Sequence, residues 1–128
     1  MGDRGQALVE FALVLPILLA LALAIAELSE VGVARLALAH AAAEGARTGA
    51  LTNDDREVRA TIEAAAAPLE VKRLEITIDP PEPQRGSDPR GTVLRVHLGY
   101  PVAAPLSFIG LPAFVVRGDA ARLMEWTP

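Results

Sequence analysis

The sequence predicts an α+β fold in which one long N-terminal helix precedes a short second helix and a small antiparallel sheet of three strands. Two observations predict it. The first 50 residues are rich in helix formers and contain a long uncharged stretch, whereas several segments after residue 70 alternate apolar and polar side chains. The chain has 128 residues, 52% of them hydrophobic, which is enough for one small domain, and the uncharged stretch raises its mean hydropathy to +0.33.

Composition excludes several classes of function. With 16 acidic and 12 basic side chains the formal charge is −4, and no segment combines Lys or Arg with aromatic residues, so we expect no nucleic-acid partner. The absence of cysteine excludes disulfides, thiolate metal sites and a thiol nucleophile. No glycine-rich phosphate loop or catalytic spacing occurs, and His40 with Glu44 offers only two ligands to a metal. We therefore expect no catalytic residue, no cofactor and no metal site.

An uncharged stretch near the N-terminus predicts a membrane-spanning helix. Residues 11–26 carry no charge, and extending the stretch back to residue 7 adds only one charged side chain, that of Glu10. Twenty helical residues span about 30 Å, the thickness of the hydrocarbon layer of a bilayer. We assign residues 6–27 to this helix. Pro16 inside it removes one backbone donor and should kink the helix.

Three kinds of N-terminal segment fit this pattern, and each would export the rest of the chain. A secretory signal would be cut at a small-residue site, such as residues 22–24 or 24–26, whereas a signal anchor would stay uncut and a pilin-type leader would be cut before the apolar stretch. Because Arg4 lies on the short side, we expect a cytoplasmic N-terminus and an extracytoplasmic C-terminal domain. Glu10 disfavours the secretory signal, since moving a carboxylate toward the bilayer centre costs about 2–3 kcal/mol. The same carboxylate also fits an interfacial residue near the positive end of the helix dipole.

The residues around Glu10 resemble the start of a type IV prepilin. In the segment RGQALVEFALVLP, Gly5 is followed five residues later by Glu10, then by Phe11, an apolar stretch and Pro16. This pattern is similar to the TadE-like pseudopilins of the Tad (tight adherence) pilus. The resemblance implies a pilin-like fold, with residues 1–5 as a short leader that a membrane-bound prepilin peptidase removes by cutting between Gly5 and Gln6. It also implies other pilins and pseudopilins of the Tad system as partners, and a role in assembling an adhesion pilus.

Helical geometry gives Glu10 a chemical reason to lie at this position. Cutting after Gly5 creates an α-amino group on Gln6, which lies four residues before Glu10 on the same helix face. That amine, or the amine of a neighbouring helix, would neutralise a carboxylate that is costly to leave unpaired in lipid. We therefore expect Glu10 to act in assembly, and we expect an extended backbone around Gly5 for the peptidase to grip. The alternatives are a generic single-pass anchored binding domain and a small secreted domain.

Beyond the membrane the helix should continue through residues 28–50, because this segment keeps strong helix formers and has only Gly32 and Gly45 as breaks before Thr48. The whole helix would be about 43 residues or about 65 Å long, with a break at Thr48-Gly49. Residues 51–128 would form the small domain. Its first element is a second helix with Thr52 or Asn53 as the N-cap, acids in the first turn and Pro68 as the stop.

Alternating residues then predict two strands joined by a loop. The first strand runs from Val71 to Asp79 and the second from Thr92 to Tyr100, with Leu94, Val96, Leu98 and Tyr100 on one face and an exposed His97 on the other. Between them, residues 80–91 (PPEPQRGSDPRG) contain four prolines and two glycines. This composition excludes a regular element and predicts a long exposed hairpin loop.

The C-terminal residues predict a third strand. Residues 101–112 are apolar and bounded by prolines, so they should cap the sheet or lie at an interface. The last strand should run through residues 114–116 and resume at residues 120–126 after a bulge at Gly118. This order of strand, apolar loop and closing strand is similar to the C-terminal half of TadE-like proteins, which extends the resemblance over nearly the whole chain.

Overall fold

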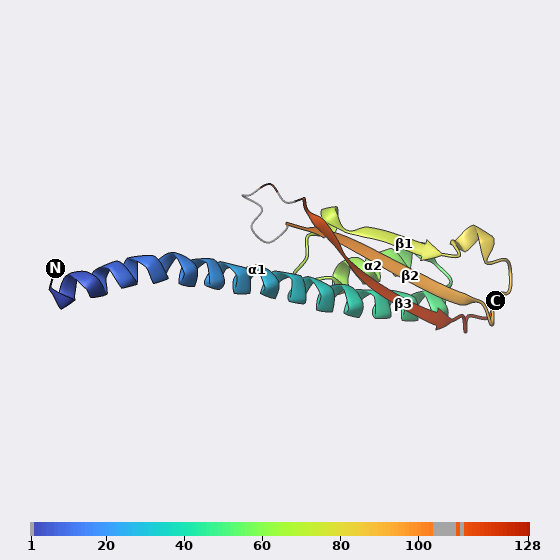
Figure 1. Cartoon of the computed structure of the whole chain (residues 1–128). Coiled ribbons are helices and arrows are strands. Elements are labelled where there is room, and N and C mark those ends of the chain that lie inside the picture. The colour runs from blue at the N-terminus through green and yellow to red at the C-terminus, as the bar shows by residue number, and fades with distance from the viewer. Residues whose placement is uncertain (1, 104–109, 111) are drawn as a thin grey trace.

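A computed structural model describes residues 2–103, 110 and 112–128 of the chain. Within these residues, one long helix carries a small domain at its C-terminal half, while its N-terminal half projects alone (Figure 1). The elements are α1 (Asp3–Thr52), α2 (Asp55–Ala65), β1 (Glu75–Asp79), β2 (Val93–Val102) and β3 (Phe114–Leu123), with short 3₁₀ turns at Val71–Arg73 and Glu82–Gln84. The predicted α+β fold is confirmed.

Small residues let α1 pack closely against the domain. Its buried positions all lie after residue 33 and recur every three or four residues, as expected for one face of a helix: Ala34, Ala37, Leu38, Ala41, Ala42, Gly45, Ala46, Gly49 and Ala50. Apart from Leu38, every one of these side chains is alanine or glycine. The core therefore combines a helix face made mostly of small residues with larger side chains from α2 and the sheet, which pack on that face.

The predicted break at Thr48-Gly49 is wrong, because α1 continues to Thr52. A Cβ at Gly49 would lie 2.4 Å from Leu94 and 2.8 Å from Val58, so the glycine is required by packing and does not end the helix. The helix ends instead at Asn53, whose left-handed backbone (φ 54°) lets its N–H bond to the Gly49 carbonyl at 3.0 Å.

The N-cap of α2 is Asp54, one residue after Asn53 and two after Thr52, the two predicted candidates. Its side chain accepts a hydrogen bond of 2.7 Å from the backbone N–H of Arg56. Val58 and Ile62 are fully buried and face α1, where Gly45 leaves room for Ile62. The helix ends at Ala65, shortly before Pro68 as expected.

The three strands form one antiparallel sheet in the order β1-β2-β3. The predicted inner face of β2 is confirmed, since Leu94, Val96 and Leu98 are at most 2% exposed. The first strand begins only at Glu75, because the residues from Val71 to Arg73 form a 3₁₀ turn in place of the predicted extended chain.

The third strand is continuous, so the predicted bulge at Gly118 is wrong. Gly118 pairs with Leu98 in regular register and lies directly on α1, where a Cβ would come within 2.6 Å of the backbone of Leu38. The strand ends at Leu123 and does not reach residue 126. The chain then turns onto the end of α1, where the N–H groups of Glu125 and Trp126 both donate to the carbonyl of Ala50 at 2.9 Å.

The loop of residues 80–91 is more ordered than its composition predicts. It includes the 3₁₀ turn at Glu82–Gln84, and although most of its residues are exposed, Arg85 and Pro89 are buried. Arg85 donates to the Pro80 carbonyl at 2.8 Å and pairs with Asp55 at the start of α2. These contacts fix the loop to the helix junction. Of the predicted apolar segment 101–112, residues 104–109 and 111 lie outside the described residues.

Candidate functional site

The N-terminal half of α1 is suited to a membrane. An 18-residue window of this helix has a mean hydropathy of 2.7, and no part of that window is buried by the rest of the protein. Large apolar side chains project on all sides, among them Leu8 at 72%, Phe11 at 63% and Leu13 at 69% exposure. Such a surface is strongly unfavourable in water at about 25 cal/mol per Å², so it has to be covered by lipid or by protein. The helix is thus a candidate membrane anchor.

The side chains of Gln6 and Glu10 point along one face of this helix. The Gln6 side-chain amide Nε2 donates to the Glu10 carboxylate Oε1 at 3.5 Å. Glu10 and its neighbour Phe11 are both exposed. The carboxylate is therefore available to a further donor, and the residue that would carry a new α-amino group lies one helical turn away.

Gly5 lies in the first turn of α1, because the helix begins at Asp3. Its N–H donates to the Gly2 carbonyl at 2.8 Å. The expected extended backbone at this position is therefore not what the structure has. Pro16 lies further along the same helix, which runs through it without interruption, and the kink there stays a prediction.

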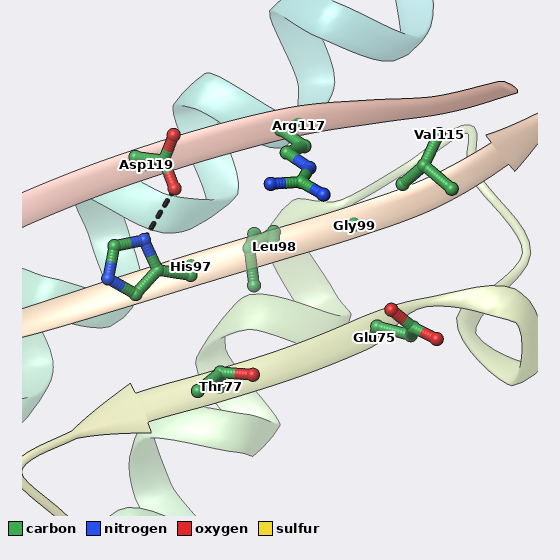
Figure 2. Close-up of a pocket in the computed structure, with 8 residues that line it drawn as sticks. All are labelled: Glu75, Thr77, His97, Leu98, Gly99, Val115, Arg117 and Asp119. Atoms are coloured by element: carbon green, nitrogen blue, oxygen red, sulfur yellow. Dashed lines mark hydrogen bonds and ion pairs between the residues drawn. The ribbon is translucent and has the colours of Figure 1, made fainter.

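A shallow groove crosses the outer face of the sheet (Figure 2). Gly99 forms its floor, and the register places Glu75 on one side of this glycine and Arg117 on the other. In the next row, His97 lies between Thr77 and Asp119, and its Nδ1 is 2.6 Å from the Asp119 carboxylate Oδ1. His97 is exposed, as predicted, whereas the sequence pattern does not reveal its carboxylate partner.

The row of Thr77, His97 and Asp119 has the side-chain types of a hydroxyl nucleophile, a base and an orienting acid. Only the contact between His97 and Asp119 is formed in the structure, and about half of each of these two side chains is exposed to solvent. Catalysis of acyl transfer requires an aligned hydroxyl and preorganised donors in a water-excluded pocket. An open sheet face does not supply that environment, so the geometry gives no support for a reaction at this groove.

The other residues singled out from the sequence lie apart from one another. His40 lies on the exposed side of α1, and Glu44 is half-buried one turn later. Among the described residues, no group of three or more His, Asp or Glu side chains is placed to hold a metal ion. The sequence pattern also did not reveal the ring contact between Arg73 and Tyr100, with 5.1 Å from the guanidinium carbon to the ring centroid, because the two residues are 27 positions apart.

A long, apolar and exposed N-terminal helix that continues without a break into a small α+β domain is consistent with the class of pilin-like membrane proteins. The chain matches the family model described as TadE-like protein over residues 5–47, which is consistent with a TadE-like pilin of the Tad system. This match confirms the resemblance at the N-terminus and covers most of α1, whereas the resemblance of the C-terminal half stays a prediction. No curated protein and no solved structure matches the chain.

Proposed function

We propose that this protein is a minor pilin, or pseudopilin, that α1 anchors in the membrane and that takes part in assembling a Tad-type adhesion pilus. The observation that carries the proposal is the family match over the helix whose N-terminal half the rest of the protein leaves uncovered. Its partners would be a prepilin peptidase, other pilins and pseudopilins of the Tad system, and the lipid bilayer. The role is structural, in keeping with a pilin family that is not enzymatic.

In this proposal the peptidase cuts between Gly5 and Gln6. The bond lies in the first turn of α1, so this turn has to open before cleavage. Opening is inexpensive there, because the first N–H groups of a helix have no partner within it and helix ends fray readily. We expect Gly5→Leu to block cleavage by placing a bulky side chain next to the cut bond. The measurement is the mass of the protein in the membrane fraction, and normal processing of this variant would count against a prepilin.

The mature N-terminus distinguishes the proposed function from its two alternatives. Cleavage after Gly5 keeps the apolar helix, cleavage near Ala26 by a signal peptidase removes it, and a plain anchor is not cut at all. N-terminal mass spectrometry of the wild-type protein therefore separates the three. A product that begins at Gln6 is expected.

The proposed orientation places the N-terminus in the cytoplasm and the domain after Glu27 outside it. Arg4 supports this orientation, because positively charged residues next to a span stay on the cytoplasmic side. A reporter that is active only outside the cytoplasm should therefore be active when it is fused after Pro128. Cytoplasmic activity would overturn the orientation while leaving the membrane span intact.

Glu10 would act in assembly through a charge-assisted contact with an α-amino group, its own or that of a neighbouring helix. The contact of 3.5 Å between the side chains of Gln6 and Glu10 puts this carboxylate within one turn of the new N-terminus. A partly desolvated contact of this kind contributes about 1–3 kcal/mol, or roughly a five- to 150-fold change in association. Glu10 lies far from the small domain, so its neutralisation should leave the domain folded.

The matched variants are Glu10→Gln, which keeps the shape and removes the charge, and Glu44→Gln on the domain part of α1. We expect Glu10→Gln to be inserted and cleaved normally, yet to co-purify poorly with other pilus components and to lower the number of pili per cell. Glu44→Gln should behave like the wild type. Normal co-purification and normal pilus numbers for Glu10→Gln would show that Glu10 is only an interfacial residue.

A further inference from the structure

The small domain begins almost where the apolar stretch of α1 ends. Val31 packs against the domain core, and Ser29 and Glu30 already line a groove shared with the sheet. At 1.5 Å per residue, Val31 lies about 8 Å along the helix from Ala26, the last residue of the uncharged stretch. The polar layer on each side of a bilayer is about 5–7 Å thick. If α1 spans the membrane as proposed above, the near end of the domain lies at the level of the lipid headgroups.

Three segments of the domain meet at this near end. The turn Val71–Arg73, the end of β2 and the start of β3 all lie on the side of the domain from which α1 projects (Figure 1). Arg73 lines the groove with Ser29 and Glu30, and Phe114 lines a second groove with Val31. The chain direction explains this arrangement, because β3 runs from Phe114 near Val31 toward the far end of α1.

The exposed side chains at this end combine apolar groups with cations. Val71 is 41%, Phe114 is 37% and Val115 is 50% exposed, and Lys72 and Arg73 are exposed beside them. Aliphatic and aromatic side chains mixed with Lys and Arg are typical of surfaces that lie in a membrane interface. This combination of side chains thus suits the boundary between water and lipid better than it suits either phase alone.

Arg73 is held in place at this surface. Its guanidinium donates to the carbonyl of Pro101 at 2.9 Å and lies over the ring of Tyr100. The turn that carries Lys72 and Val71 is thereby fixed to the end of β2. Arg73 and the turn that carries it thus have a defined position at this edge of the domain.

We propose that the membrane-proximal edge, formed by Val71, Lys72, Arg73, Phe114 and Val115, docks in the headgroup layer of the bilayer that α1 spans. The neighbouring charges are balanced, since the cations Arg35, Lys72, Arg73 and Arg117 are accompanied by the acids Glu27, Glu30, Glu70 and Glu75. The short connection to the span and the apolar side chains therefore hold the edge in place. Docking should not require anionic lipid.

The test uses the full chain in phosphatidylcholine nanodiscs, with one cysteine introduced at a time and labelled with a fluorophore. The natural chain has no cysteine, so each label reports one position. Val71→Cys and Phe114→Cys probe the edge, Ser87→Cys probes the far end of the domain, and Leu18→Cys probes the span. Quenchers attached to the lipid at headgroup depth and at acyl-chain depth are compared for each label.

We expect the headgroup quencher to act at least about threefold more strongly on the two edge labels than on the Ser87→Cys label, because the far end lies several helical turns further from the bilayer. Replacing a third of the lipid by phosphatidylglycerol should leave this ratio unchanged. Quenching that appears only with anionic lipid would overturn the proposal, because attraction between charges would then replace the short connection as its cause.

A second variant tests the geometry directly. Seven alanines inserted between Glu27 and Leu28 lengthen α1 by about 10 Å and turn the domain by only about 20°. The edge labels should then lose their headgroup quenching, while the Leu18→Cys label keeps its deep quenching. Equal quenching of edge and far-end labels in the natural chain, with the Leu18→Cys label deep in the bilayer, would refute docking and leave the membrane span standing. A Leu18→Cys label that stays outside the bilayer would refute both.

Discussion

At Gly118 the sheet lies directly on the backbone of α1, and adding one methyl group there should separate the two. A Cβ at this glycine would lie 2.6 Å from the carbonyl carbon and from Cβ of Leu38, and 2.8 Å from the Leu38 carbonyl oxygen. Unstrained contacts between carbon atoms are about 3.5–4.0 Å. Since two of the three close atoms belong to the helix backbone, no side-chain rotation can relieve the contact. For Gly118→Ala, β3 and α1 must move apart by about 1 Å.

The size of the effect follows from what this movement disrupts. A gap of about 1 Å removes roughly a quarter to a half of the dispersion attraction along the affected contacts, and inserting a group into a packed core costs about 1–3 kcal/mol. Replacing the glycine also reduces the conformational freedom of the unfolded chain, which stabilises the folded state by only about 0.5–1 kcal/mol. We expect a net loss of about 1–2 kcal/mol in the free energy of unfolding, equivalent to about 5–15 °C in Tm for a domain of this size.

The assay is thermal unfolding of the full chain in detergent micelles, followed by the fluorescence of Trp126. This is the only tryptophan of the chain, and its backbone N–H donates to the carbonyl of Ala50, so its fluorescence reports on the small domain. The matched control is Gly99→Ala on the outer face of β2. Its Cβ would lie 3.3 Å from Val115 and 3.4 Å from Glu75, both side chains that can shift, so its effect should stay within about 0.5 kcal/mol. A Gly118→Ala protein with the wild-type Tm, or equal losses in both variants, would refute the reasoning.

Three further substitutions test the helix junction and the loop. Arg85→Met removes the buried guanidinium that pairs with Asp55, whose carboxylate is itself partly hydrated. We expect the free energy of unfolding, measured by urea denaturation, to fall by about 1–3 kcal/mol. A fall of less than about 0.5 kcal/mol would contradict the conclusion that Arg85 fixes the loop. Asp54→Ala removes the N-cap of α2 and should cost about 1 kcal/mol by the same measurement, whereas Asp54→Asn should restore it. The hydrogen bond from the side chain of Arg90 lowers the pKa of the Asp88 carboxyl. This pairing therefore stabilises the folded state at pH values above the pKa that Asp88 has in the unfolded chain. The stabilisation is lost as the pH falls through the lower pKa that Asp88 has in the folded protein. In Arg90→Gln the pKa of Asp88, followed by NMR titration of its carboxyl carbon, should rise toward its ordinary value, and an unchanged titration would show that Arg90 has no such influence.

Local patterns predicted the elements of this fold because each pattern has a local physical cause. Alternation along β2 identified its inner face, since Leu94 and Val96 both point to the core. The uncharged stretch identified the exposed half of α1 by its length alone. These features depend on neighbours within a few residues, which a sequence displays directly.

Sequence patterns fail where distant residues decide the structure. They predict a helix break at Thr48-Gly49 and a bulge at Gly118, but Gly49 and Gly118 are glycines because another element passes within van der Waals distance. Composition predicts an exposed loop around Arg85, although its side chain is buried and pairs with Asp55, thirty residues earlier in the chain. The pairing of His97 with Asp119 depends on the register between β2 and β3, which a strand pattern does not specify.

The unbroken course of α1 also fixes a rotational relation between the membrane and the domain. Eighteen residues complete about five turns of an α-helix, so Glu10, Leu28 and Ala46 share nearly the same azimuth around the helix axis. Ala46 is buried and lines one groove with Ala120 of β3. The carboxylate of Glu10 therefore projects toward the side of the axis on which β3 lies, because the helix is continuous from Glu10 to Ala46. A neighbouring subunit whose amine reaches Glu10 would approach from the side that the sheet overhangs, so the shape of the domain would limit which subunits can reach that carboxylate.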